Sequence, residues 1–307
     1  MMTRETLLRR LERPEGRIRA VLDTDAYNEI DDQFALAYML QKTEIFDIQA
    51  LTAAPFHNEK SSGPGEGMRL SHREILHILK LMDREELRDM VFEGSDAYLP
   101  SETAPVESRA ARELIRLAAD PDDLLYIIAI GAITNVASAL LLDPSLAERC
   151  VVVWLGGHGW HWPNTEEFNM RQDVAAARVV FGSGAPVVQF PCMGVVSELR
   201  TTGPELEHWL RGKNALCDYL VAHTNDEVSG YAGGTAWSRV IWDVSAVAWF
   251  TDPSFTAGRV APSPICGYDH QYAFDPGRRP CRVIEAVNRD GIFTDLFRTL
   301  AGKTQKR

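Results

Sequence analysis

Short apolar runs alternate along much of the chain with segments whose apolar positions recur every three or four residues. The runs predict buried strands, and the periodic segments predict helices between them, since one face of a helix recurs at that spacing. The expected strands are residues 18–22, 46–53, 124–130, 151–155 and 186–190, and the expected helices are 33–41, 67–82, 133–142 and 174–181. This alternation predicts an α/β fold: an open, mostly parallel β-sheet with helices on both faces.

Glycine-rich polar stretches interrupt the pattern and predict loops. They are residues 57–67, 156–168 and 226–234. The N-terminal segment predicts an amphipathic surface helix with Leu7, Leu8 and Leu11 on one face. No repeat or low-complexity linker divides the chain, so we expect one domain over residues 1–307 with a Rossmann-like core.

Composition limits the classes of function that fit. The chain has 32 Lys+Arg against 43 Asp+Glu, a net charge of −11, which disfavours nucleic acid because phosphate binding needs clustered basic residues. No apolar run reaches the roughly 18 residues that a membrane-spanning helix needs, and the N-terminus lacks the apolar region of a secretory signal. Five scattered cysteines without a CxxC pair indicate free thiols. We therefore expect a cytoplasmic protein that acts on a small molecule and binds no membrane.

Acidic residues crowd the end of the first expected strand. Asp23, Asp25, Asp31 and Asp32 lie within ten residues, with Glu29 among them. Because like charges repel at close range, such a cluster indicates a bound cation, and oxygen ligands favour calcium or magnesium. In the alternative interpretation, Asp31 and Asp32 only cap and charge the first turn of the following helix.

The Asp23-Thr24-Asp25 segment, followed by Asp31-Asp32 and an apolar helix, resembles the N-terminal metal motif of the inosine-uridine-preferring nucleoside hydrolases. That motif usually reads DxDPGxDD, whereas residues 26–30 here form a longer segment without Pro-Gly. Further segments are similar to family motifs in the same order, and they are residues 129–135, 154–157, 167–169 and 242–243. The resemblance covers roughly residues 18–300. It implies hydrolysis of the N-glycosidic bond of a ribonucleoside to ribose and free base.

The resemblance also implies roles for individual residues. A bound Ca²⁺ would hold the ribose hydroxyls and a water, and its implied ligands are Asp25, Asp32, Asp243 and the backbone carbonyl of Ile130. Asp25 is also the implied catalytic base for that water. The implied ribose-binding residues are Asp31, Asn164, Glu167 and Asn169. For residues 167–169, the alternative is a turn with Phe168 in the core.

The means of activating the leaving base differs from the usual family pattern. Trp242 stands where many members carry a proton-donating histidine, and it resembles the purine-specific branch, in which indoles stack on the base. The alternative is that Trp242 is only part of the core. His158 and His161, beside the expected ribose site, are alternative proton donors. Weaker candidates for lining a base pocket are Tyr231, Trp237 and Arg239.

Three other functions stay open. The chain could hydrolyse another N-riboside, or bind a nucleoside or sugar on the same fold without catalysis. It could also be a haloacid-dehalogenase-type phosphatase, which likewise begins with DxD after a strand. Such a phosphatase needs a later Lys and a Gly-Asp pair, which we cannot place in this sequence. The family tendency implies a homodimer or homotetramer.

Overall fold

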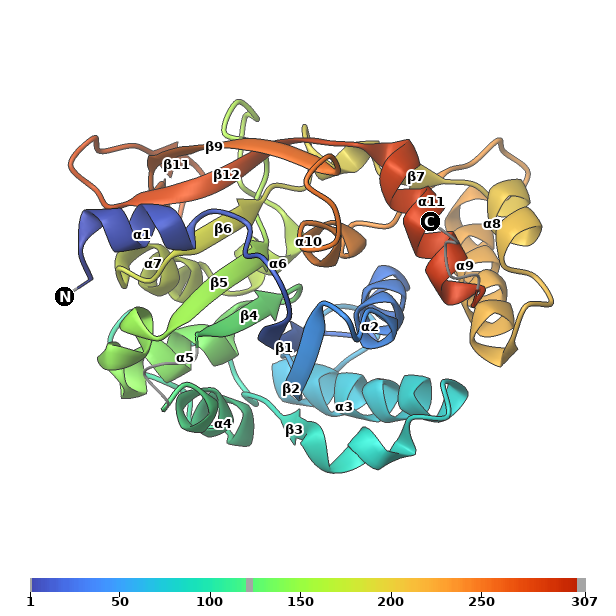
Figure 1. Ribbon diagram of the computed structural model, residues 1–307, viewed down its shortest axis with the longest axis horizontal. Coiled ribbons are helices and arrows are strands. Elements are labelled where there is room, and N and C mark those ends of the chain that lie inside the picture. The colour runs from blue at the N-terminus through green and yellow to red at the C-terminus, as the bar shows by residue number, and fades with distance from the viewer. Residues whose placement is uncertain (1, 120–123, 303–307) are drawn as a thin grey trace.

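A twisted eight-stranded sheet runs through the centre of the protein (Figure 1). The computed structural model describes residues 2–119 and 124–302. The strand order is β3-β2-β1-β4-β5-β6-β12-β9, and every pairing in this sheet is parallel except that of β12 with β9. The strands are β1 (Ile18–Thr24), β2 (Phe46–Ala53), β3 (Val91–Glu93), β4 (Leu125–Ala129), β5 (Cys150–Leu155), β6 (Val187–Phe190), β9 (Thr256–Pro262) and β12 (Pro280–Val287).

Helices and short strand pairs surround this sheet. The helices are α1 (Arg4–Arg10), α2 (Asp31–Gln41), α3 (Pro64–Leu81), α4 (Arg109–Leu117), α5 (Thr134–Leu142), α6 (Phe168–Gln172), α7 (Val174–Gly182), α8 (Gly203–Trp209), α9 (Ala215–Ala232), α10 (Val244–Ala248) and α11 (Arg289–Leu300). The short antiparallel pairs are β7 (Arg200–Thr201) with β8 (Arg239–Val240), and β10 (Ile265–Cys266) with β11 (Tyr272–Ala273). Short 3-10 helices are η1 (Glu85–Met90), η2 (Pro144–Glu148) and η3 (Val196–Glu198).

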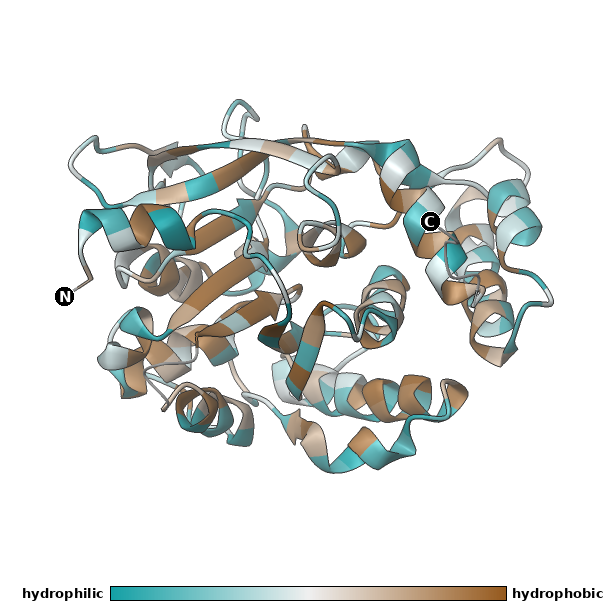
Figure 2. Ribbon diagram, in the orientation of Figure 1, coloured by the Kyte–Doolittle hydropathy of each residue, from teal (hydrophilic) through white to brown (hydrophobic). Residues whose placement is uncertain are grey.

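The two faces of the sheet carry separate hydrophobic cores. On β4, Ile128 joins the core that contains α2, α3 and α10, whereas its neighbour Ile127 joins the core that contains α4, α5 and α7. Successive side chains of a strand point to opposite faces, so helices cover both faces, and the predicted α/β fold is confirmed. Figure 2 shows hydrophobic residues concentrated along β4 and β5, as strands covered on both sides require.

The predicted strands and helices are all present, with boundaries shifted by a few residues. The loop predicted at residues 226–234 is wrong, because α9 continues to Ala232. Leu220, Thr224 and Val228 are buried at helical spacing, so packing of this face outweighs the weak helix propensity of Gly230. The helix ends at Gly233 and Gly234, and Gly234 has the positive φ that favours glycine.

The N-terminal helix also differs from the prediction in one residue. Leu7 and Leu11 are buried, but Leu8 is 36% exposed. Leu8 is about 100° around the helix from Leu7, so it lies at the edge of the buried side, where solvent reaches it. Within the described residues, no helix has the length and apolar character needed to cross a membrane.

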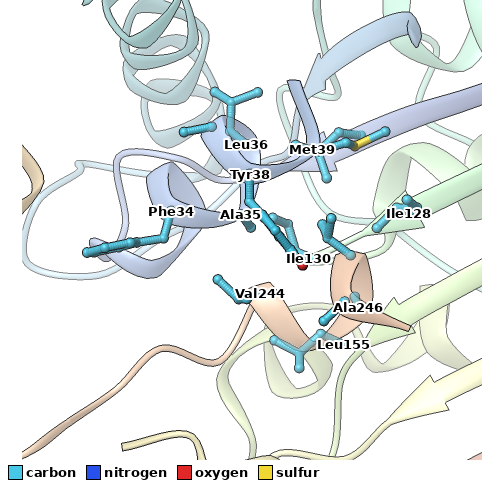
Figure 3. Packing of buried hydrophobic residues seen from close by; sticks show 14 of the residues in the cluster. Phe34, Ala35, Leu36, Tyr38, Met39, Ile128, Ile130, Leu155, Val244 and Ala246 are labelled. Atoms are coloured by element: carbon cyan, nitrogen blue, oxygen red, sulfur yellow. The ribbon is translucent and has the colours of Figure 1, made fainter. Parts of the chain in front are cut away.

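The strand order brings polar residues to one edge of the sheet. β1, β4, β5 and β6 are neighbours and parallel, so their carboxyl ends meet there. Beside this edge, α2 and α10 pack together on Ile130 and Leu155 (Figure 3). Ile130 directly follows β4, and Leu155 is the last residue of β5. The amino ends of α2 and α10 therefore lie close to the strand ends, where ligands bind in open α/β sheets.

Candidate active site

A cavity of about 240 Å³ lies at the carboxyl ends of these strands. Nearly all the residues predicted from the sequence line it, namely Asp25, Asp31, Asp32, Ile130, His158, Glu167, Asn169, Trp242 and Asp243. Asn164 is not among the lining residues; its side chain accepts a hydrogen bond from the backbone N–H of Glu166 at 3.1 Å. Glu29, named above only as part of the acidic cluster, also lines the wall. The wall residues that the sequence did not predict are Asn28, Leu155, Glu166, Phe168, Arg171, Cys192 and Met193.

Three buried carboxylates form the centre of the site. One oxygen from each of Asp31, Asp32 and Asp243 lies within 4.8 Å of the others, which suits a metal ion. Asp31 and Asp32 stand in the first turn of α2, and Asp243 directly precedes α10. None of the three acts mainly as a helix cap: Asp243 makes no capping bond, Asp32 accepts from the hydroxyl of Thr24, and Asp31 accepts from the backbone N–H of Trp242.

Asp25 lies outside this tight group but lines the same cavity. Its carboxylate is buried, and Oδ2 has no hydrogen-bond partner among the described residues. Burial raises the pKa of Asp25 well above its ordinary value, and the nearby Asp32 raises it further. Burial and neighbouring carboxylates likewise raise the pKa values of Asp32 and Asp243 strongly. Such mutual repulsion leaves a strong need for a compensating positive charge.

Asp23 has a supporting position behind the cavity. Its Oδ1 accepts hydrogen bonds from Thr52 Oγ1 at 2.6 Å and from Asn135 Nδ2 at 2.8 Å. Burial raises the pKa of Asp23 to about 6, although both hydrogen bonds favour the charged form. Asn135 also bonds the backbone of Ala53 and Ser95, so Asp23 joins β1 to the ends of neighbouring segments.

Glu167 and Asn169 are held by the backbone. The Glu167 carboxylate accepts from the N–H groups of Gly157 at 2.8 Å, Asn169 at 2.8 Å and Met170 at 2.9 Å, and so caps α6. Asn169 Nδ2 donates to the carbonyl of Ile130 at 3.0 Å and to that of Leu155 at 3.1 Å. These bonds fix the orientation of the Ile130 carbonyl, the predicted backbone ligand.

His158 and Trp242 line the cavity from two different loops. His158 Nδ1 accepts from the N–H of Met193 at 3.3 Å, so in the neutral ring the proton lies on Nε2. Burial lowers the pKa of His158, which keeps the ring neutral at physiological pH. Trp242 is half-buried and packs partly against the hydrophobic core.

The weaker candidates lie outside this cavity. His161 lines a separate cavity of about 550 Å³ together with Trp160 and Phe274. Tyr231 is largely exposed, and neither Trp237 nor Arg239 lines the wall of the active-site cavity. The structure thus brings the predicted metal residues and, except for Asn164, the predicted ribose residues together, but not the additional base-pocket residues.

The site has the features expected of a metal centre for a hard cation. Asp25 Oδ2 and Asp31 Oδ1 are buried carboxylate oxygens without hydrogen-bond partners among the described residues. An ion placed among these groups would satisfy both, and would relieve the repulsion that raises the carboxyl pKa values. The donors are all oxygens, which is the ligand set that calcium and magnesium prefer.

Comparison with known proteins identifies the family to which this chain belongs. The family model described as inosine-uridine preferring nucleoside hydrolase matches residues 20–294. Among curated relatives, the pyrimidine-specific ribonucleoside hydrolase RihA of Citrobacter koseri is 26% identical over 306 residues, covering 87% of this chain and 93% of the relative. The RihA of Klebsiella pneumoniae is 26% identical over 253 residues, covering 73% of this chain and 76% of the relative.

Solved structures show the same fold. A plant nucleoside hydrolase superposes with a TM-score of 0.72 at 22% identity, covering 92% of this chain and 99% of that one. A purine-preferring ribonucleoside hydrolase from Gardnerella vaginalis has a TM-score of 0.71 at 20% identity, covering 93% and 98%. This family assignment removes the phosphatase alternative. The chain belongs to the inosine-uridine preferring nucleoside hydrolase family and is a hydrolase of N-glycosyl bonds.

Proposed function

We propose that this protein hydrolyses the N-glycosidic bond of a ribonucleoside in a calcium-dependent reaction, and that the leaving base is a purine that stacks on Trp242. The observation that carries the proposal is the group of buried carboxylates in a cavity at the strand ends, two of which have an oxygen without a hydrogen-bond partner among the described residues. A polyol such as ribose needs fixed acceptors of this kind, and a bond cleaved through an oxocarbenium-like transition state favours negative charge nearby.

Four groups would hold the calcium ion: the carboxylates of Asp25, Asp32 and Asp243, and the Ile130 carbonyl. Asp31 is a further candidate ligand, because one of its carboxylate oxygens lies within 4.8 Å of oxygens of both Asp32 and Asp243. A calcium ion held there would supply positive charge that orients the ribose hydroxyls and lowers the pKa of a nearby water.

Asp25 is the proposed general base. It lines the cavity and has an oxygen without a hydrogen-bond partner among the described residues, so it can accept the proton of the attacking water. Asp31 Oδ1, also without such a partner, would accept from a ribose hydroxyl. Glu167 and Asn169 are proposed for the remaining hydroxyls, with Glu167 limited to its unused lone pairs because three backbone N–H groups already occupy it. Asn164 is left out because it does not line the cavity.

Two residues would act on the leaving base. The half-buried indole of Trp242 offers a flat surface on which a purine can stack. His158 carries its neutral-state proton on Nε2, because Nδ1 accepts from Met193, so it would donate a hydrogen bond rather than accept one. The names of the curated relatives favour pyrimidine ribosides, and that alternative is decided by the substrate panel below.

The test is metal content of the purified protein, followed by base release from a panel of purine and pyrimidine ribonucleosides with and without chelator. We expect about one calcium per chain and chelator-sensitive release of purines. Release unaffected by removal of all metal would contradict the calcium proposal. Faster release of pyrimidines than of purines would contradict the role given to Trp242.

We also propose a cytoplasmic location and a homodimeric or homotetrameric state. The location is supported by the five cysteines, all of which are free and buried. The oligomeric state is an expectation from the family resemblance, and light scattering after size-exclusion chromatography measures it directly.

A further inference from the structure

Arg239 lies beside the acidic cavity without lining it. It belongs to β8, where it pairs with Thr201 of β7, and its side chain is only 11% exposed. Its Nη2 lies 2.9 Å from Glu29 Oε2, 3.1 Å from Glu227 Oε1 and 3.6 Å from Asp31 Oδ1. One guanidinium nitrogen therefore faces three carboxylates.

These carboxylates come from three separate segments. Glu29 lies in the segment between β1 and α2, Asp31 begins α2, and Glu227 lies on α9. Their charges repel one another, and a guanidinium beside them offsets that repulsion. Arg239 thus joins the segment before α2 to the far end of α9 at the edge of the cavity.

The carboxylates differ in how firmly the rest of the protein holds them. The Asp31 side chain is 3% exposed and also accepts the backbone N–H of Trp242, so it has little freedom. The Glu29 side chain is 43% exposed, so it can turn into solvent if Arg239 is removed. Glu29 and Asp31 line the cavity, but Glu227 does not. The contact with Arg239 therefore determines chiefly where the Glu29 carboxylate stands.

We propose that Arg239 is a positioning residue for substrate binding, which holds the carboxylates of Glu29 and Asp31 at the cavity wall as hydrogen-bond acceptors. The inference rests on the proposed function and goes beyond it by assigning a specificity role to Glu29. An ionised carboxylate only accepts hydrogen bonds, so the substrate group that faces Glu29 must be a donor, either a hydroxyl or an amino group.

Kinetics of matched variants test this role. Arg239→Met keeps the length and apolar stem but removes the charge, Glu29→Gln neutralises the proposed acceptor, and a double variant combines them. Glu227→Gln is the control, since Glu227 contacts the same nitrogen outside the cavity. Circular dichroism and calcium content confirm that each variant is folded and loaded.

We expect Arg239→Met to raise KM for the best nucleoside about tenfold with a much smaller change in kcat, because the loss is in substrate binding. Because Arg239 acts through Glu29, the double variant should raise KM no further than Arg239→Met alone. Glu227→Gln should stay within about twofold of the wild type. The proposal would be overturned if the increase in KM of the double variant equalled the product of the increases in the two single variants. It would also be overturned if Glu227→Gln raised KM as much as Arg239→Met.

A structural measurement separates this inference from the proposed function. If the wild type releases base from no nucleoside, the proposed function fails. The role of Arg239 can still be decided from crystal structures of the wild type and of Arg239→Met, both grown with calcium. We expect the Glu29 carboxylate to leave the cavity wall in the variant. The same Glu29 rotamer in both structures would overturn the inference whatever the activity.

Discussion

The side-chain Nδ2 of Asn169 donates a hydrogen bond to the backbone carbonyl of Ile130 at 3.0 Å. Ile130 follows β4, and Asn169 lies on α6, so the bond joins two segments that each contribute to the active-site wall. A carbonyl oxygen has two lone pairs, and the bond from Asn169 leaves one of them for a metal ion. Asn169 therefore orients the proposed backbone ligand and also lines the cavity.

Asn169→Ala should weaken calcium binding about tenfold, because loss of an orienting partner lets the Ile130 carbonyl rotate. Isothermal titration of the metal-free protein with calcium measures this. Asn214→Ala is a matched control, since Asn214 Nδ2 donates to the carbonyl of Leu300 at 2.9 Å, away from the site. Equal calcium affinity of wild type and Asn169→Ala would show that the carbonyl needs no such support.

Asp25→Asn should lower kcat by about 10³-fold and also weaken calcium binding, because one residue is both the proposed base and a proposed ligand. The kcat of the wild type and of Asp25→Asn is compared at saturating calcium. Both proteins then carry the metal, so any remaining loss of turnover is due to loss of the base. Asp143→Asn, which changes an aspartate that caps η2, serves as the control. Near-normal turnover of calcium-loaded Asp25→Asn would exclude Asp25 as the base.

Trp242→Ala should reduce kcat/KM for purine ribosides about tenfold more than for pyrimidine ribosides, because a larger flat ring loses more stacking area. Trp242→Phe keeps an aromatic face and should retain most of the preference. The measurement is kcat/KM for inosine, guanosine, uridine and cytidine with each variant. Equal losses for all four would assign Trp242 to the wall rather than to base recognition.

Metal removal should make stability fall as pH rises. Burial raises the pKa of Asp31 from 3.8 to about 7, and Arg239 offsets only part of this effect. The folded chain then binds a proton that the unfolded chain releases, so the free energy of unfolding in chelator decreases between about pH 4 and pH 7. Asp31→Asn lacks this titration and should be more stable than the wild type at pH 8 by up to roughly 4 kcal/mol.

Urea denaturation in chelator across this pH range measures the difference between the two proteins. Near pH 4 the Asp31 carboxyl is protonated in the folded wild type, so the two should have similar stability there. Added calcium should restore wild-type stability at pH 8, because the ion replaces the proton as the compensating charge. Parallel stability curves for the two proteins would show that Asp31 is ionised without cost.

Much of the fold could be predicted because buried strands and periodic helices leave a local pattern in the sequence. The run at residues 124–130 has no polar residue, and it forms β4, covered on both faces. The end of α9 could not be predicted in this way, because α9 packs against α3 and α8, and Val228 is buried only in the folded chain. Local composition at Ser229 and Gly230 indicates a turn, and packing overrides it.

The candidate site could be predicted as far as its residues lie in recognisable motifs. Asp25, Ile130 and Asp243 were found through motifs, and the structure brings them to one cavity. The contact of Arg239 with Glu29 joins residues 210 positions apart, so no local sequence pattern could predict it. The role of Glu167 as a helix cap was also hidden, since a carboxylate near glycines suits a turn and a ligand site equally well.

The hydrogen bonds from three backbone N–H groups to Glu167 make one part of the cavity wall more rigid than the rest. They hold residues 157–170 of the wall together, and Asn169 joins this wall to the ends of β4 and β5, so a change there disturbs the main chain. Another part of the wall is made by side chains such as Glu29 and Trp242, which lie outside the helices and strands and can be exchanged without breaking either. Selection for a new substrate, in nature or in the laboratory, should therefore change Glu29 and Trp242 first.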